Sequence, residues 1–126
     1  DGDTAVDGSA NGSTVTGAFV CSDLTDNTFF LVVNVAAGIA STSALETALE
    51  YGGSLQMTAS GALAVGDRML VVYDDTVDTY IAMVTFNNAV AATGWAGSGT
   101  LSAVNLVKLT GIADATGVAG ADLDLT

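Results

Sequence analysis

Two apolar runs, residues 28–36 and residues 68–86, constrain the fold more than any other feature of this chain. Successive side chains of a strand point to opposite faces, so a strand with one face in water alternates apolar and polar residues. These runs do not alternate, as the neighbours Leu31 and Val32 illustrate. Such strands are covered on both faces. One sheet and one helix cannot provide that much cover, so we expect two stacked sheets or cover from neighbouring copies of the chain.

The sequence predicts one helix, within residues 41–53. Ser43 and Glu46 match a capping box, which places the N-cap at Ser43. Gly52 and Gly53 are expected to end the helix. The apolar residues recur at the spacing of one helical face: Ala44, Leu45, Ala48 and Leu49.

The remaining elements are predicted to be strands. The arms of a hairpin are expected at residues 68–74 and 79–85, with aspartates at the turn, and a long loop surrounds Trp95. Further strands are expected at residues 14–21, 28–36, 54–60, 101–112 and 121–125. The prediction is a flexible acidic arm or linker at 1–13 and a single domain at 14–126. That domain is mainly β with one short α-helix, and is either a compact antiparallel β-sandwich-like fold or an α+β fold.

Charge excludes several partners. The chain carries 14 Asp and Glu against 2 Lys and Arg, a net charge of -12. Two cations cannot neutralise a nucleic-acid backbone, and an anionic membrane surface would repel the chain. No apolar run approaches the roughly 20 residues that span a bilayer. A lysine-poor, acidic surface fits an extracellular setting in which cations screen it.

Residue types also limit the chemistry. The chain has no histidine, which removes histidine-dependent nucleophilic systems and the usual histidine zinc sites. Lys108 is the only lysine and is interpreted as a solvated strand residue. Glu46 and Glu50 lie one helical turn apart, the first assigned to the cap and the second to solvent. We therefore expect no enzyme activity.

Three aspartates are the candidate metal ligands: Asp74, Asp75 and Asp78. Calcium takes six to eight oxygen ligands, and a turn can supply carboxylates together with carbonyls. Aspartate is also favoured in turns for its own backbone hydrogen bonds, so both readings stay open. The weaker acidic candidates are Asp1, Asp3 and Asp7 in the arm, and Asp122 and Asp124 on one strand face.

Two further residues have alternative readings. Cys21 is the one cysteine, so it is a small buried residue, a partner in an intermolecular disulfide, or a reactive thiol. Trp95 packs over a sheet edge or serves as an aromatic platform for a glycan. The chain begins at Asp1 without a signal-like apolar segment, and we expect it to be processed or part of a longer protein.

Four motifs carry a family resemblance: "ALETALE", "AVGDRMLVVYDD", "DTYIAMV" and "NLVKLTGIADA". Together they resemble a module of bacterial repeats-in-toxin proteins, the hemolysin-type calcium-binding surface proteins, over residues 41–119. The glycine-rich calcium-binding nonapeptides of such proteins are absent, and "DGDTAVDGS" only resembles them. The resemblance implies an exported, adhesive or surface-layer context, and it carries over neither defined calcium ligands nor an enzyme activity.

These observations lead to two hypotheses. The first is a non-enzymatic structural subunit, extracellular or on the surface of a bacterium, that assembles with copies of itself into a surface layer, filament or adhesin. The second is a monomeric calcium- or glycan-binding module of a larger secreted bacterial protein. Calcium is the one cofactor expected, and a cell-surface glycan is the one other ligand.

Overall fold

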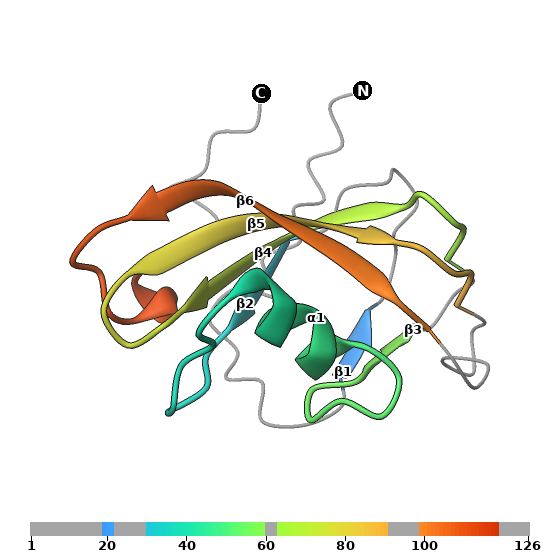
Figure 1. Ribbon diagram of the computed structural model, residues 1–126, viewed down its shortest axis with the longest axis horizontal. Coiled ribbons are helices and arrows are strands. Elements are labelled where there is room, and N and C mark those ends of the chain that lie inside the picture. Colours follow the sequence, from blue (N-terminus) through green and yellow to red (C-terminus); the bar gives the residue numbers. More distant parts are fainter. Residues whose placement is uncertain (1–18, 22–29, 60–62, 91–98, 119–126) are drawn as a thin grey trace.

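A computed structural model describes residues 19–21, 30–59, 63–90 and 99–118 (Figure 1). A four-stranded sheet has the order β2-β4-β5-β6, and a smaller sheet pairs β1 with β3. The strands are β1 (Phe19–Cys21), β2 (Phe30–Val33), β3 (Met57–Ala59), β4 (Arg68–Asp74), β5 (Thr79–Phe86) and β6 (Leu101–Leu109). The helices are α1 (Thr42–Leu49) and the short 3-10 helix η2 (Ala115–Gly117).

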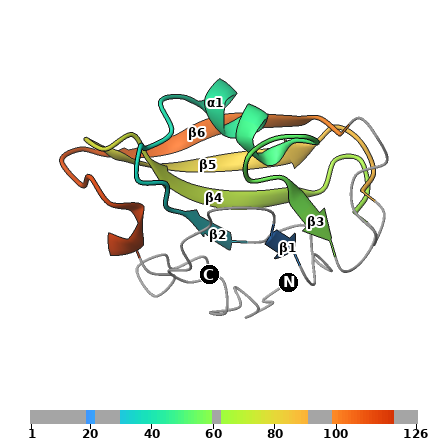
Figure 2. The same cartoon turned by 90° about the horizontal axis from the view of Figure 1, so that it is seen from below.

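The four-stranded sheet is mixed. β4, β5 and β6 pair antiparallel in sequence order, as expected for strands joined by hairpins. β2 pairs parallel with β4, because the chain leaves β2, passes through α1 and β3, and returns to the sheet. Figure 2 shows the outcome, with α1 next to β6 and β2 at the opposite edge of the sheet. β1 and β3 are also parallel.

The sheet has two faces with different cover. The helix face carries the larger core, in which strand residues such as Val71 and Val84 pack with Leu45 and Leu49 of α1. The second face carries a smaller core, where Val32, Val72 and Ile81 pack with Ala115 and Val118. Adjacent strand residues are therefore buried on opposite sides. The predicted two-sided burial of the central strands is confirmed.

The prediction of a mainly β domain with one short helix is confirmed. The hairpin arms lie where the sequence places them, since β4 spans residues 68–74 and β5 spans residues 79–86. The strand at residues 101–112 ends earlier, at Leu109, because Gly111 adopts a φ of 78° that turns the chain. The acidic arm, the segment around Trp95 and the strand at residues 121–125 lie outside the described residues.

The predicted capping box is wrong. Ser41 is the N-cap, because its side-chain oxygen accepts the backbone N–H of Ala44 at 3.2 Å. The helix therefore begins at Thr42 and ends at Leu49, ahead of the two glycines. The carboxylate of Glu46 takes no part in the cap, and its partner lies on β6. In the described segments, no helix has the length and apolar character needed to cross a bilayer.

Candidate functional site

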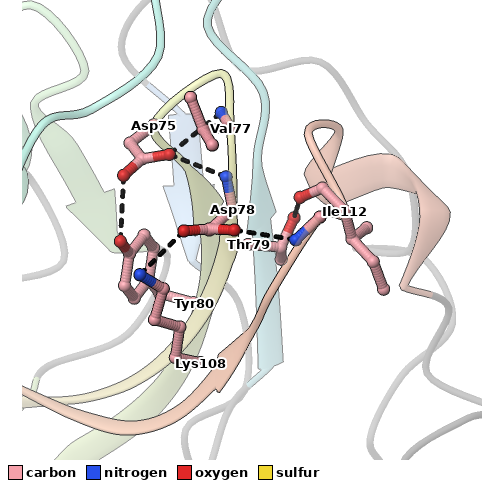
Figure 3. Close-up of polar contacts among 8 residues, drawn as sticks. Asp75, Val77, Asp78, Thr79, Tyr80, Lys108 and Ile112 are labelled. Atoms are coloured by element: carbon pink, nitrogen blue, oxygen red, sulfur yellow. Dashed lines mark hydrogen bonds and ion pairs between the residues drawn. The ribbon is translucent and has the colours of Figure 1, made fainter.

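The three candidate aspartates lie at the end of β4 and in the turn that joins it to β5. Figure 3 shows two of them, Asp75 and Asp78, with their hydrogen-bond partners. We call Asp74, Asp75 and Asp78 the aspartate turn. Each of their carboxylates accepts at least one backbone N–H group. The turn connects the hairpin to two other segments, the one before α1 and the one after β6.

Asp75 stabilises the turn itself. Its Oδ1 atom accepts the N–H of Val77 at 3.0 Å and the N–H of Asp78 at 2.8 Å. An aspartate that binds backbone N–H groups two and three residues ahead is a standard turn former. Its Oδ2 atom accepts the hydroxyl of Tyr80 at 2.9 Å. The ring of Tyr80 stacks on Tyr73 with centroids 5.2 Å apart, so the turn is anchored to the helix face of the sheet.

Asp78 connects the turn to β6. Its Oδ2 atom lies 2.7 Å from Nζ of Lys108, and its Oδ1 atom accepts the N–H of Gly111 at 2.7 Å. Next to it, the hydroxyl of Thr79 donates to the carbonyl of Ile112 at 2.6 Å. Lys108 lies in β6 with 52% of its side chain exposed, as expected for a solvated strand lysine, but it has a partner that the sequence did not predict. Its ammonium pairs with a carboxylate and lies 5.6 Å from the ring centroid of Tyr80.

Asp74 is the most deeply buried of the three, with 4% of its surface exposed against 7% for Asp78. Its carboxylate accepts the N–H of Thr76 at 3.0 Å and the N–H of Ala115 at 3.2 Å. Its backbone carbonyl accepts the N–H of Ile39 at 2.7 Å. One residue thus holds the hairpin, η2 and the segment before α1 together.

The tip of the turn contains a strained residue. Thr76 has a φ of 73°, a conformation that is costly for a β-branched residue. We expect Thr76→Gly to stabilise the fold by about 1 kcal/mol, because relief of the strain exceeds the entropy that glycine loses on folding. Urea unfolding of the two proteins measures the difference. Thr76→Ala keeps the strain and serves as the control, and equal stability of the glycine variant and wild type would contradict the prediction.

The charge states of the turn follow from these contacts. The N–H of Asp78 and the hydroxyl of Tyr80 lower the pKa of Asp75 below its ordinary 3.8. The ammonium of Lys108 and the N–H of Gly111 lower the pKa of Asp78. Asp78 in turn raises the pKa of Lys108 above 10.5. At neutral pH the pair is therefore a carboxylate and an ammonium, and Lys108 is no nucleophile.

These shifts predict acid sensitivity. A carboxylate whose pKa is lower in the folded state stabilises the fold above its unfolded pKa, and that stability is lost as the pH falls through the folded value. We therefore expect the urea midpoint to fall from about pH 5 downward. Asp78→Asn should lower the midpoint at pH 7 and make it fall less steeply below about pH 5. Parallel pH profiles for the variant and wild type would contradict this assignment.

Calcium binding by the aspartate turn stays a prediction. In the described part of the chain, no three metal-ligating side chains have a geometry that suits an ion. Two carboxylate oxygens already have side-chain partners: Asp75 Oδ2 accepts the hydroxyl of Tyr80, and Asp78 Oδ2 pairs with Lys108. An ion that bound there would compete with those donors, and with Lys108 in particular.

Sequence reasoning missed the role of two glutamates, one within α1 and one at its C-cap, the second of which was assigned to solvent. The carboxylate of Glu46 accepts the N–H of Ala103 at 2.6 Å, and that of Glu50 accepts the N–H of Leu101 at 2.7 Å. Both donors are alternate residues of β6, the edge strand of the sheet. The two glutamates therefore occupy N–H groups that an incoming strand would need. Their spacing of one helical turn was the visible signal, but it does not identify the partner.

β6 also exposes apolar side chains that the sequence did not single out as exposed. We call Val104, Leu106 and Val107 the apolar row, and their exposed fractions are 57%, 53% and 43%. Val104 pairs with Met83 and Val107 with Ile81, so both lie on the second face of the sheet. Leu106 lies at the register shift between those pairs and faces no residue of β5.

Other candidates fall outside the description. Trp95, the arm aspartates Asp1, Asp3 and Asp7, and Asp122 and Asp124 lie in segments that the structure does not describe. The backbone of Cys21 belongs to β1, where it pairs with Ala59, but the surroundings of its thiol are not described. The alternatives for these residues stay as predictions.

Comparison of the chain with protein-family models, with curated proteins and with solved structures finds no match. The resemblance to repeats-in-toxin surface proteins therefore stays a sequence-based expectation.

Proposed function

We propose that this chain is a non-enzymatic structural subunit of an extracellular bacterial assembly, which joins with copies of itself. The observation that carries the proposal is the apolar row on the edge strand of an otherwise anionic protein. Large apolar side chains grouped on an exposed surface are typical of interaction sites. The extracellular setting rests on the charge balance and on the resemblance of the motifs.

The polar groups of the aspartate turn support a structural role. The hydrogen bonds of its carboxylates, apart from the one with Tyr80, run to backbone N–H groups, and the ion pair of Asp78 with Lys108 joins the turn to β6. Such groups hold segments in place and are not poised to exchange protons near neutral pH. We propose that the turn keeps the second face of the sheet rigid, so that β6 presents a fixed surface.

The test is the state of association of the purified protein. Light scattering and sedimentation velocity over a wide concentration range should show oligomers, and electron microscopy should show whether they are layers, filaments or small particles. The like charge of the copies predicts that association strengthens with added salt. A monomer at the highest concentration, with and without calcium, would overturn the proposal.

A second candidate is a calcium-binding module, which the gathering of three carboxylates at one turn favours. Calorimetry with calcium chloride should then give heat that Asp75→Asn removes. Asp67→Asn is the matched control, since Asp67 lies in a separate turn where it accepts the N–H of Ala64. No heat with wild type, or equal heat with both variants, would rule out this site. No described residue favours a glycan ligand in particular.

A further inference from the structure

The backbone edge of β6 is a poor place for a second strand to join. Glu46 and Glu50 occupy the outward N–H groups of Ala103 and Leu101. Beyond them the register shift at Leu106 interrupts the regular spacing of the edge. A bulge and a lysine on an edge strand, here Lys108, are features that discourage strand addition. The side-chain surface of β6 is therefore better suited to contact than its backbone.

The second face of the sheet is covered unevenly. Ala115 and Val118 cover Val32, Val72 and Ile81, which lie toward β2 and the hairpin. Toward β6, the described residues leave the apolar row exposed and Met83 half-buried. The apolar row and Met83 therefore extend the smaller core of the second face toward solvent. They lie on β6 and its neighbour β5, and the aspartate turn fixes the end of both strands.

The charge around the apolar row favours a second copy of this chain as the occupant. β5 and β6 contain no Asp or Glu, although the chain has a net charge of -12. The carboxylates of Glu46 and Glu50 that reach the β6 backbone come from the helix side of the sheet, opposite the face that carries Val104 and Val107. The one cation in β5 and β6 beyond the exposed face of the row, Lys108, is neutralised by Asp78 at 2.7 Å. Two molecules of the same negative charge repel each other least where each presents an uncharged apolar surface. A cationic partner would instead be drawn to the carboxylates elsewhere.

We infer that two copies of this chain associate face to face through the apolar row, with their second faces in contact and their β6 backbones unpaired. The inference rests on the proposed self-assembly and specifies its surface. Identical patches that meet each other form a two-fold, closed contact. A larger assembly would then be built from dimers that join through another surface. The row is small beside the roughly 800 Å² per partner of a standard interface, so the contact is expected to be weak and concentration-dependent.

The experiment compares two sets of variants by sedimentation equilibrium. Val104→Thr/Leu106→Gln/Val107→Thr removes the row and leaves the backbone of β6 unchanged. Val65→Thr is the control, because this exposed valine, at 67%, lies in the turn before β4 and outside the aspartate turn. We expect the dissociation constant of the dimer to rise at least about tenfold in the row variant and to stay within about twofold in the control.

Cross-linking provides a test that does not depend on the stability of the triple variant. In a Cys21→Ser background, Leu106→Cys should form a disulfide between copies much faster than Val65→Cys. Association that persists in the folded row variant, or equal cross-linking at both positions, would overturn this inference and leave the proposed function standing. A wild-type protein that stays monomeric would overturn both the inference and the proposed function. The same holds if the protein is monomeric because another segment of the chain covers the row.

Discussion

Leu45→Ala should destabilise the domain by about 3 to 4 kcal/mol. Leu45 is fully buried in the core of the helix face, where it packs with residues of β2, β4 and β5. Truncation removes apolar contacts and leaves a cavity between a rigid sheet and a helix that two carboxylates hold to β6. Urea unfolding followed by circular dichroism measures the loss.

The control for this change lies on the same helix. Thr47 is exposed, and its hydroxyl donates to the carbonyl of Ser43 at 2.9 Å. Thr47→Ala loses that bond but gains helix propensity, so the free energy of unfolding should stay within about 0.5 kcal/mol of wild type. Similar losses in the two variants would show that α1 contributes through its helicity and not through its packed face.

Gly38→Ala is expected to cost about 3 kcal/mol, from two separate causes. Gly38 has a φ of 67°, which is unfavourable for alanine. A Cβ atom at this position would also lie 2.7 Å from the backbone carbonyl carbon of Asp75 and 2.9 Å from Cγ2 of Thr76. The segment before α1 would therefore be pushed off the aspartate turn, and the bond from Ile39 to Asp74 would be strained.

Gly52→Ala separates these two causes. Gly52 has a φ of 81°, yet nothing lies within 4 Å of a Cβ atom placed there. We expect Gly52→Ala to lower the free energy of unfolding by about 1 kcal/mol, which is the cost of the positive φ alone. Thermal and urea unfolding of both variants give the comparison. If Gly38→Ala lost no more than Gly52→Ala, close packing of the turn against Gly38 would be contradicted.

The features that the sequence predicted are those determined by nearby residues. The hairpin from Arg68 to Phe86 followed from apolar runs on both sides of turn-forming aspartates, and the helix followed from its apolar spacing. Its N-cap did not, because Ser41 and Ser43 are chemically equal candidates and only the backbone shows which one accepts an N–H group. The local sequence pattern therefore predicted which helices and strands form more reliably than the residues at which they begin and end.

The contacts that the sequence did not predict join distant residues. Glu46 and Ala103 are 57 positions apart, and Glu50 and Leu101 are 51 apart, so no spacing rule connects them. Lys108 meets Asp78 only because β5 and β6 pair in a particular register with one shift. The exposure of the apolar row likewise depends on which half of the second face η2 covers.

The parallel pairing of β2 with β4 also has a kinetic consequence. β4, β5 and β6 follow one another along the chain, so each connection of this antiparallel meander is shorter than the segment 34–67 that separates β2 from β4. Pairing of β2 with β4, as between Val32 and Val72, instead requires the chain to close a crossover that includes α1 and β3. Non-local pairing of this kind is slow to form, so we expect the meander to form the folding nucleus and β2 to dock late. Substitutions in β2 should then speed unfolding more than they slow folding.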